Sequence, residues 1–231
     1  MNNDSKKKKI IRFICFVILC ALIFTGLNWL FTIKSQINNK VTLENIVADN
    51  RTLYKEQDHS LDVIAMGSSH AFTSFNPLQM FEEQGFTSLT MAGPFVKIDT
   101  AEYLLSEALK TQSPKALVLE VGALQDNGTD YDNFQLEAII NLRPSIEKYN
   151  FVQKLYPDDS AMRATAFLPI VGFHVRWVEL TPEDFTYLFY RDYMHGFVPV
   201  FVKRPGIESQ FDISEGKPLV QKEVENLRHL A

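Results

Sequence analysis

Ser69 is the residue of this sequence whose position points most clearly to chemistry. It stands in DVIAMGSSHAFTSFNP, directly after an apolar, β-prone run that ends at Gly67. A serine at the turn between a buried strand and a helix exposes its hydroxyl, and nearby backbone N–H groups can bind an oxyanion. Ser69 is therefore a candidate nucleophile for acyl transfer. The same pattern also fits a serine that only caps a helix or shapes a turn.

Four further polar residues could contact a substrate or support the residues that do: His70, Glu120, His174 and Arg176. His70 directly follows Ser69, and neighbouring side chains diverge at a turn, so His70 is a poor candidate for the catalytic base. Glu120 ends a predicted strand. There it could be a buried carboxylate with a raised pKa, or it could pair with a lysine.

The second half of the chain contains two unusual aromatic pieces, FHVRWVE and YMHGFVP. His174 and His195, one from each piece, could approach the serine, or they could pack structurally. Arg176 beside Trp177 could bind an anionic glycan or a polyol phosphate. An arginine and an aromatic ring packed under a loop is the plainer interpretation.

Metal and cofactor sites are not predicted. Cys15 and Cys20 lie in the apolar N-terminal run, which excludes cysteine zinc sites and disulfides in the rest of the chain. Asp126, Asp130 and Asp132 are too irregularly spaced for an EF-hand, and none of the ten glycines forms a phosphate loop. We therefore expect no cofactor.

Three short apolar runs, at residues 61–66, 87–91 and 116–121, are typical of buried strands. Segments of helical period separate them, which gives the β-α-β-α-β order of a parallel sheet. In doubly wound sheets, ligands bind beyond the carboxyl ends of the strands, where Ser69 and Glu120 both stand. The sequence therefore predicts an α/β fold whose strand ends converge on one site.

The helix signals are local. Asn76 followed by Pro77 predicts a helix start, and Gly85 predicts its end. Asp99 and Glu102 have the spacing of a capping box at the start of a second helix. The rest of the chain predicts a helical, aromatic-rich insertion, a possible strand at Val198–Val202 and a helix with one apolar face at 218–230.

Residues 13–33, FICFVILCALIFTGLNWLFTI, are uncharged and long enough to cross a hydrocarbon core of about 30 Å. This apolar run is longer than the apolar segment of a signal peptide, and no cleavage site of small residues follows it. Both features favour an uncleaved anchor over a cleaved signal. Basic residues precede it, which predicts a cytoplasmic N-terminus. The predicted parts are a basic tail at 1–12, a transmembrane helix at 13–33, a juxtamembrane spacer at 34–60 and an extracellular domain at 61–231.

The formal net charge of −5 hides an asymmetry, because Lys6 to Lys9 and Arg12 outweigh Asp4 and give residues 1–12 a charge of +4. The remaining chain therefore carries −9. An acidic domain without a basic stripe cannot neutralise phosphates, which argues against nucleic-acid binding. With 46% hydrophobic and 22% charged residues, the composition is that of a folded domain.

Over about residues 60–200, the sequence resembles the SGNH/GDSL hydrolase-like proteins of Gram-positive bacteria, in the branch related to DltD-type and alginate O-acetyltransferase-type envelope proteins. The resemblance rests on MGSSHAFTSFNP, LTMAGP, SPKALVLEVG, and FHVRWVELTPEDF followed by YMHGFVP. It implies a flavodoxin-like, three-layer α/β fold with Ser69 at the position of the nucleophile. It also implies that the backbone N–H groups of Ser69 and Gly93 stabilise a tetrahedral oxyanion.

Two features of that family are missing. The piece from Glu120 to Leu124 lacks the asparagine of the third block, Gly-x-Asn-Asp. The last block, an Asp-x-x-His that supplies the base and its orienting acid, is absent as well, because Asn226 stands three positions before His229. We therefore expect a C-terminally shortened member of the family with an unpaired sheet edge.

The resemblance implies a membrane-anchored serine esterase or O-acyltransferase that acts on a cell-envelope glycan or a teichoic-acid-like polymer. Its other partner is the lipid bilayer, through residues 13–33. The missing acid and base leave an alternative. The chain could be a non-catalytic binding or scaffold protein of the envelope, or an inactive shortened member of the family.

Overall fold

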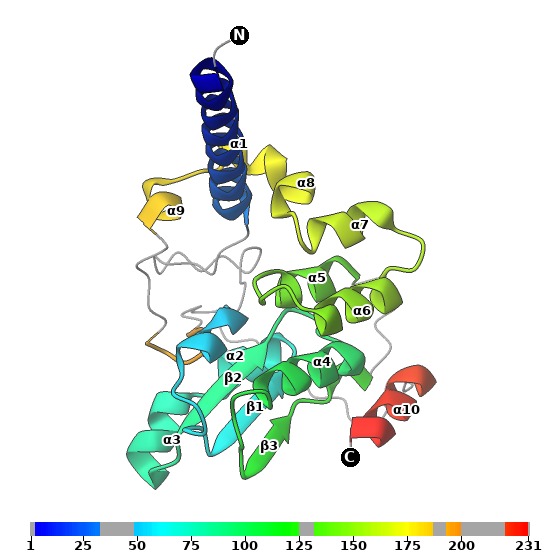
Figure 1. Cartoon of the computed structure of the whole chain (residues 1–231). Coiled ribbons are helices and arrows are strands. Elements are labelled where there is room, and N and C mark those ends of the chain that lie inside the picture. The colour runs from blue at the N-terminus through cyan, green and yellow to red at the C-terminus, as the bar shows by residue number, and fades with distance from the viewer. Residues whose placement is uncertain (1–2, 33–48, 125–131, 187–192, 200–219, 231) are drawn as a thin grey trace.

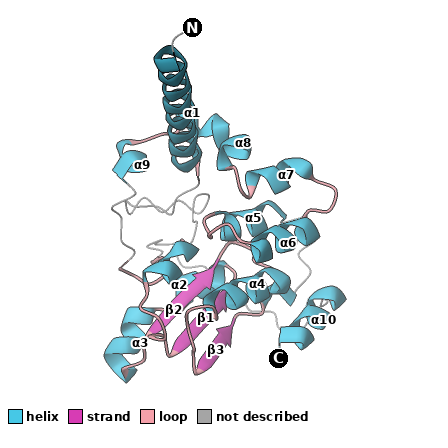
Figure 2. Ribbon diagram, in the orientation of Figure 1, coloured by secondary structure: helices cyan, strands magenta, loops and turns pink. Residues whose placement is uncertain are grey.

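A computed structural model describes residues 3–32, 49–124, 132–186, 193–199 and 220–230 of the chain. Over these residues the protein is a mixed α/β structure with a three-stranded parallel sheet (Figure 2). The strands are β1 (Val63–Gly67), β2 (Ser88–Ala92) and β3 (Ala116–Leu119), in the order β2-β1-β3. The predicted α/β class and parallel sheet are thereby confirmed.

Helices cover the sheet and continue to one side of it, toward the long N-terminal helix (Figure 1). Two short helices connect β1 with β2, and one longer helix connects β2 with β3. The helical elements are α1 (Asn3–Phe31), η1 (Asn50–Lys55), α2 (Ser69–Ser74), α3 (Pro77–Gln84), α4 (Ile98–Ala108), η2 (Gly122–Leu124), α5 (Asp132–Ile140), α6 (Ile146–Leu155), α7 (Ser160–Thr165), α8 (Pro169–Phe173), η3 (His174–Val178), α9 (Pro182–Thr186) and α10 (Gln221–Leu230).

The local signals for α3 are confirmed. The Asn76 side chain accepts hydrogen bonds from the backbone N–H groups of Leu78 and Gln79, and Pro77 follows in the first turn. Gly85 ends the helix with a φ of 74°, the left-handed conformation that glycine adopts without strain. Each of these signals acts within a few residues, which is why the sequence could reveal them.

The start of α4 differs from the prediction. The helix begins at Ile98, and the predicted capping box of Asp99 and Glu102 does not supply its N-cap. Instead, the Glu223 carboxylate of α10 accepts a hydrogen bond from the Ile98 N–H group at 3.0 Å. The first turn of α4 is thus satisfied by a residue far along the chain, and local spacing could not predict that partner.

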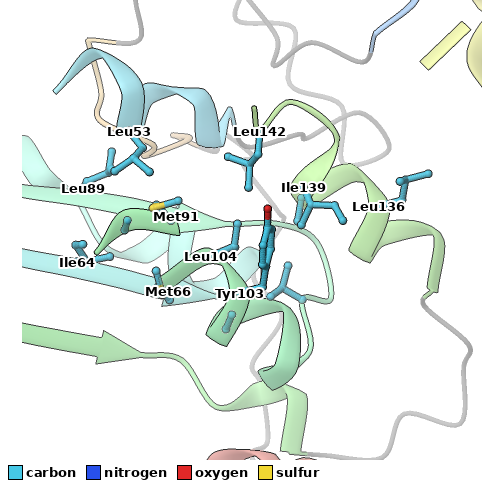
Figure 3. Close-up of a cluster of buried hydrophobic side chains, with 14 of the residues drawn as sticks. Leu53, Ile64, Met66, Leu89, Met91, Tyr103, Leu104, Leu136, Ile139 and Leu142 are labelled. Carbon is cyan, nitrogen blue, oxygen red and sulfur yellow. The ribbon is translucent and has the colours of Figure 1, made fainter. Parts of the chain in front are cut away.

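The hydrophobic core packs the sheet against helices α4 and α5 (Figure 3). Alternate residues of the strands share one face of the sheet, so Ile64 and Met66 of β1 line up beside Leu89 and Met91 of β2. Leu104 of α4 packs in the same cluster. All five are at most 1% exposed. Burying each such side chain contributes about 1.5–3 kcal/mol.

The domain includes residues that the sequence analysis assigned to a spacer. Asn50 is only 2% exposed, and its amide donates to the carbonyl oxygens of Ala92 at 3.0 Å and Ala138 at 2.8 Å. The Ala92 N–H group donates back to it at 3.0 Å. Leu53 joins the hydrophobic core. The domain therefore begins before residue 61, and residues 33–48 lie outside the described part of the chain.

Residues 193–199 lie along the outer edge of β2. The His195 carbonyl accepts a hydrogen bond from the Thr90 N–H group at 2.9 Å, and the Val198 N–H group donates to Phe72 of α2 at 2.8 Å. The possible strand at Val198–Val202 is not formed at its first two residues, and the other three lie outside the described residues.

The other edge of the sheet is β3. Within the described ranges, β3 pairs with β1 alone, and its Leu117 and Val118 side chains are exposed. These exposed side chains differ from the expectation of a buried third strand. A strand becomes buried only when elements cover its faces and its outer edge, which the apolar run itself does not show.

The Lys148 side chain is buried beneath the end of α5. Its Nζ donates to the carbonyl oxygens of Ile140 at 3.1 Å and Leu142 at 2.9 Å. Burial lowers the pKa of this ammonium group from 10.5 to about 8, although Glu107 acts in the opposite direction. The charged form is therefore less favourable in the folded protein than in the unfolded chain.

We expect the free energy of unfolding to rise between pH 8 and pH 10.5, because the unfolded chain then binds a proton that the folded Lys148 has lost. Urea unfolding of the full chain in a mild detergent at several pH values measures this. Lys148→Met is the control and should flatten that rise. An equally steep rise in Lys148→Met would contradict the assignment to Lys148.

Candidate active site

The candidate site begins at the turn between β1 and α2. β1 ends at Gly67, Ser68 is the N-cap residue, and Ser69 is the first residue of α2. The Ser68 side chain accepts a hydrogen bond from the His70 N–H group at 3.3 Å. Ser68 is buried, whereas Ser69 is partly exposed. The two adjacent serines therefore have different environments.

Glu120 reaches the same turn from the end of β3. Its N–H group donates to the Met66 carbonyl at 2.8 Å, which extends the pairing with β1 by one residue. Its carboxylate accepts hydrogen bonds from the Ser68 N–H group at 3.0 Å and the Ser68 hydroxyl at 2.5 Å. The Gly122 N–H group adds a third at 2.5 Å. The predicted convergence of strand ends holds for Glu120 and the serine turn.

The environment of Glu120 differs from both predicted alternatives. Burial raises the pKa of its carboxyl, but the hydrogen bonds from Ser68 and Gly122 and the nearby His70 ring outweigh burial and hold the pKa below its usual value. The partners are a serine, a glycine N–H group and a histidine ring, not a lysine. Glu120 is therefore ionised at neutral pH and holds the serine turn through these hydrogen bonds.

His70 lies beside this pair but faces solvent. Its Nδ1 is 3.4 Å from the Ser68 hydroxyl and 3.9 Å from a Glu120 carboxylate oxygen, and its side chain is 78% exposed. Ser68, Glu120 and His70 thus form a compact polar group. Ser68 was not among the residues predicted from the sequence to contact a substrate. Its role as the buried partner of Glu120 could not be predicted, because the two residues are 52 positions apart.

Ser69 has a free hydroxyl. Among the described residues, no group forms a hydrogen bond with its Oγ atom, and no acceptor faces its backbone N–H group. Its carbonyl accepts a hydrogen bond from the Thr73 hydroxyl at 2.7 Å. The Ser69 hydroxyl and N–H group are therefore available to a ligand, while the Ser68 hydroxyl is already committed to Glu120.

The second predicted oxyanion donor, Gly93, lies next to this turn. Its N–H group donates to the Gly67 carbonyl at 3.3 Å, which continues the pairing of β1 and β2 past their last residues. In this arrangement the Gly93 N–H group is engaged. An oxyanion would have to displace a long hydrogen bond in order to reach it.

The structure does not bring His174 and Arg176 together with Ser69. Both belong to η3, which contacts α8 and α1, while α2 lies at the sheet (Figure 1). Arg176 donates to carbonyl oxygens at the end of α1. His195 pairs its Nδ1 with Glu56 at 2.8 Å. Sequence order could not show that His174 and Arg176 lie apart from Ser69, because the helices that carry them extend away from the sheet toward α1 (Figure 1).

The comparisons with known proteins do not identify a relative. No model of a known protein family matches the chain, and neither a curated protein nor a solved structure is similar to it at a significant level. Over the ranges that the structure describes, no three histidine, cysteine or acidic side chains are arranged to hold a metal ion. The site is therefore interpreted from its own geometry.

Gly67 is required for the close approach of Glu120. Its φ is 146°, and a Cβ atom there would lie 2.5 Å from the Glu120 Cβ atom. Gly67→Ala should therefore destabilise the fold by about 3 kcal/mol or more, through backbone strain and overpacking. Gly85→Ala is a matched control, because Gly85 also has a positive φ but no atom within 4 Å of such a Cβ.

Gly85→Ala should cost only about 1–2 kcal/mol. Both variants can be compared with the native chain by urea unfolding in detergent. Equal losses would mean that the approach of Glu120 does not constrain Gly67.

Glu120→Gln tests whether the Glu120 carboxylate stabilises the serine turn. A glutamine amide places a donor against the N–H or O–H donors of Ser68 and Gly122, so the variant should lose about 1–3 kcal/mol of stability at pH 7. In the native chain the contribution of Glu120 is fully present above pH 4.5 and is lost as the pH falls below that value, because its folded pKa is lowered. Acid titration of stability should therefore be shallower in Glu120→Gln, and identical titration curves would contradict this role of the carboxylate.

Proposed function

We propose that this protein is a membrane-anchored, SGNH-type serine esterase or O-acyltransferase that acts on a polymer of the cell envelope. The observation that carries the proposal is Ser69, which is partly exposed at the carboxyl end of the central strand and whose hydroxyl has no hydrogen-bond partner among the described residues. Ligands of open parallel sheets bind at this end. The neighbouring Ser68 and Glu120 hold the turn that presents it.

In the proposed reaction, the Ser69 oxygen attacks the carbonyl of an ester, the acyl C–O bond of that ester breaks, and its alcohol leaves as the acyl-enzyme forms. Water or a polymer hydroxyl then takes the acyl group, which breaks the acyl–serine bond and restores the Ser69 hydroxyl. The Ser69 N–H group would donate to the oxyanion of the tetrahedral intermediate. The Ser69 proton must pass to a base. Among the described side chains, His70 is the imidazole closest in sequence, and it is bonded toward Ser68 rather than Ser69.

The strand order supports the family assignment. The order β2-β1-β3 is the beginning of the flavodoxin-like order 2-1-3-4-5, with helices in both crossovers. A three-layer SGNH fold continues this arrangement. The family assignment remains a proposal that rests on this order and on the sequence motifs around Ser69.

The location is proposed from α1. Its segment Lys6–Phe31 is long and apolar enough to span a bilayer, and none of it is covered in its most apolar window. Basic residues precede the apolar run, so we propose a cytoplasmic N-terminus and an extracellular domain. That orientation places Ser69 on the side of the envelope polymers.

One observation favours a second function. No described residue accepts a hydrogen bond from the Ser69 hydroxyl, so the base of a serine hydrolase is missing from this arrangement. A domain of this kind could bind an envelope glycan without reacting with it. In that case Ser69 would contact the ligand as a hydrogen-bonding group only.

Labelling of the full chain with a fluorophosphonate separates the two functions. A nucleophilic Ser69 should be labelled, Ser69→Ala should lose all labelling, and Ser74→Ala should retain it. Ser74 is the matched control, because it is an exposed serine at the other end of the same helix. Absence of labelling in the native chain, together with retained binding to isolated cell wall, would replace the enzyme with a binding protein.

A further inference from the structure

Two short helical elements, α8 and η3, lie beside the C-terminal end of α1 (Figure 1), and α9 is joined to η3 through Asp184 and Arg176. We call residues 168–186, which contain them, the collar. The Asn28 side chain of α1 accepts a hydrogen bond from the Ile170 N–H group at 3.1 Å. Arg176 donates to the carbonyl oxygens of Phe31 at 3.2 Å and Thr32 at 2.8 Å. The collar is therefore bonded to the last turn of α1.

Arg176 joins the collar to the end of α1, and we call this contact the clamp. Its guanidinium satisfies carbonyl groups that the end of a helix leaves without partners. Asp184 holds it from the other side at 3.2 Å, and the same carboxylate accepts the Thr181 N–H group at 3.0 Å. The Arg176 side chain is 19% exposed and that of Asp184 is 8% exposed. The Arg176 and Asp184 charges are thus largely covered, while Glu179 of the collar is exposed.

Many of the exposed side chains of the collar are large and apolar, and the exposed His174 and Glu179 lie among them in the chain. Trp177 is 69% exposed, although large aromatic side chains are normally buried in a soluble domain. Clusters of exposed apolar side chains mark surfaces that contact a partner or a membrane. The exposed large apolar residues of the collar are Leu168, Val171, Val175, Trp177, Val178 and Phe185.

The position of the collar along α1 sets its depth. The uncharged part of α1, residues 13–31, is about 28 Å long, close to the thickness of a hydrocarbon core. Residues 6–27 of α1 are exposed along their length, and the collar bonds to residues 28–32. The collar therefore lies where the apolar run ends, at the level of the lipid headgroups.

We propose that the collar is a membrane-interfacial element whose exposed apolar side chains insert between the headgroups and acyl chains of the leaflet from which α1 emerges. The inference rests on the proposed membrane insertion of α1. The ligand is a phospholipid surface that is recognised by apolar burial. Attraction to anionic headgroups contributes little, because the Arg176 guanidinium is engaged with α1 and Asp184.

If the collar also contacts the membrane, α1 fixes the orientation of the domain and does not only attach it to the bilayer. With α1 and the collar both in the membrane, the domain has a defined orientation. The carboxyl ends of the strands lie on the side of the sheet that is nearer to α1 (Figure 1). The turn at Ser69 would then be held at a fixed height above the bilayer.

Trp29 and Trp177 are the two tryptophans of the chain, so each can be observed alone. The full chain with Trp29→Phe reports on the collar, and the full chain with Trp177→Phe reports on α1. Both are reconstituted into phosphatidylcholine vesicles that contain lipid brominated either near the glycerol or near the chain ends. Bromine quenches tryptophan by contact, and its presence in both leaflets makes the result independent of protein orientation.

We expect Trp177 to be quenched more by bromine near the glycerol than by bromine at the chain ends, and to be unaffected by added salt. Quenching of Trp29 without quenching of Trp177 would overturn the interfacial collar and leave the anchor intact. No quenching of Trp29 would show that the anchor itself is wrong. If Trp177 is shielded from acrylamide but not quenched by lipid, a second copy or another protein covers it, which also overturns the proposal.

Arg176→Gln in the Trp29→Phe chain tests the clamp. Loss of the forked contacts to α1 and Asp184 should release the collar and reduce the quenching of Trp177 by shallow bromine. Glu179→Gln is a matched control, because Glu179 is 4.0 Å from Arg176 but mostly exposed. Unchanged quenching in Arg176→Gln would contradict the clamp.

Discussion

The Glu120 carboxylate accepts three hydrogen bonds at the end of the sheet, two from Ser68 and one from Gly122. The candidate site depends on this contact, because it fixes the turn from which α2 starts. Gly67 and Gly122 leave the space that the carboxylate occupies. Ionised Glu120 thus orders the backbone beside Ser69 without contacting the Ser69 hydroxyl itself.

In other parts of the fold, too, a single polar side chain bonds to the backbone of a distant element. Asn50 satisfies the backbone of Ala92 and Ala138, and Glu223 satisfies the first turn of α4. Arg176 does the same for the end of α1. In each case one buried or half-buried polar side chain satisfies backbone groups of a distant element. A buried backbone group without a partner costs free energy, so these few residues determine which elements can lie together.

The two serines of the turn have different roles. Ser68 is buried, and its hydroxyl is bound to Glu120, so it stabilises the turn. Ser69 is partly exposed, and no group of the described residues bonds to its hydroxyl or its N–H group. The Ser69 hydroxyl becomes a strong nucleophile only if a base accepts its proton.

The sequence by itself determined the features that depend on short-range physics. The apolar runs gave strands at Val63–Gly67, Ser88–Ala92 and Ala116–Leu119, and Asn76, Pro77 and Gly85 set the limits of α3. These signals act within one turn or one strand. The long apolar run at the N-terminus likewise gave one helix that is long enough to span a bilayer.

Only the tertiary structure decided which distant polar groups meet. It paired Glu120 with Ser68, placed Asn50 in the core, and separated Arg176 and His174 from the serine turn. Such contacts depend on how crossovers and loops arrange elements that lie tens of residues apart in the chain. The sequence around a polar residue does not show which distant residue it will contact. Local patterns therefore determined the elements, and long-range hydrogen bonding determined the site.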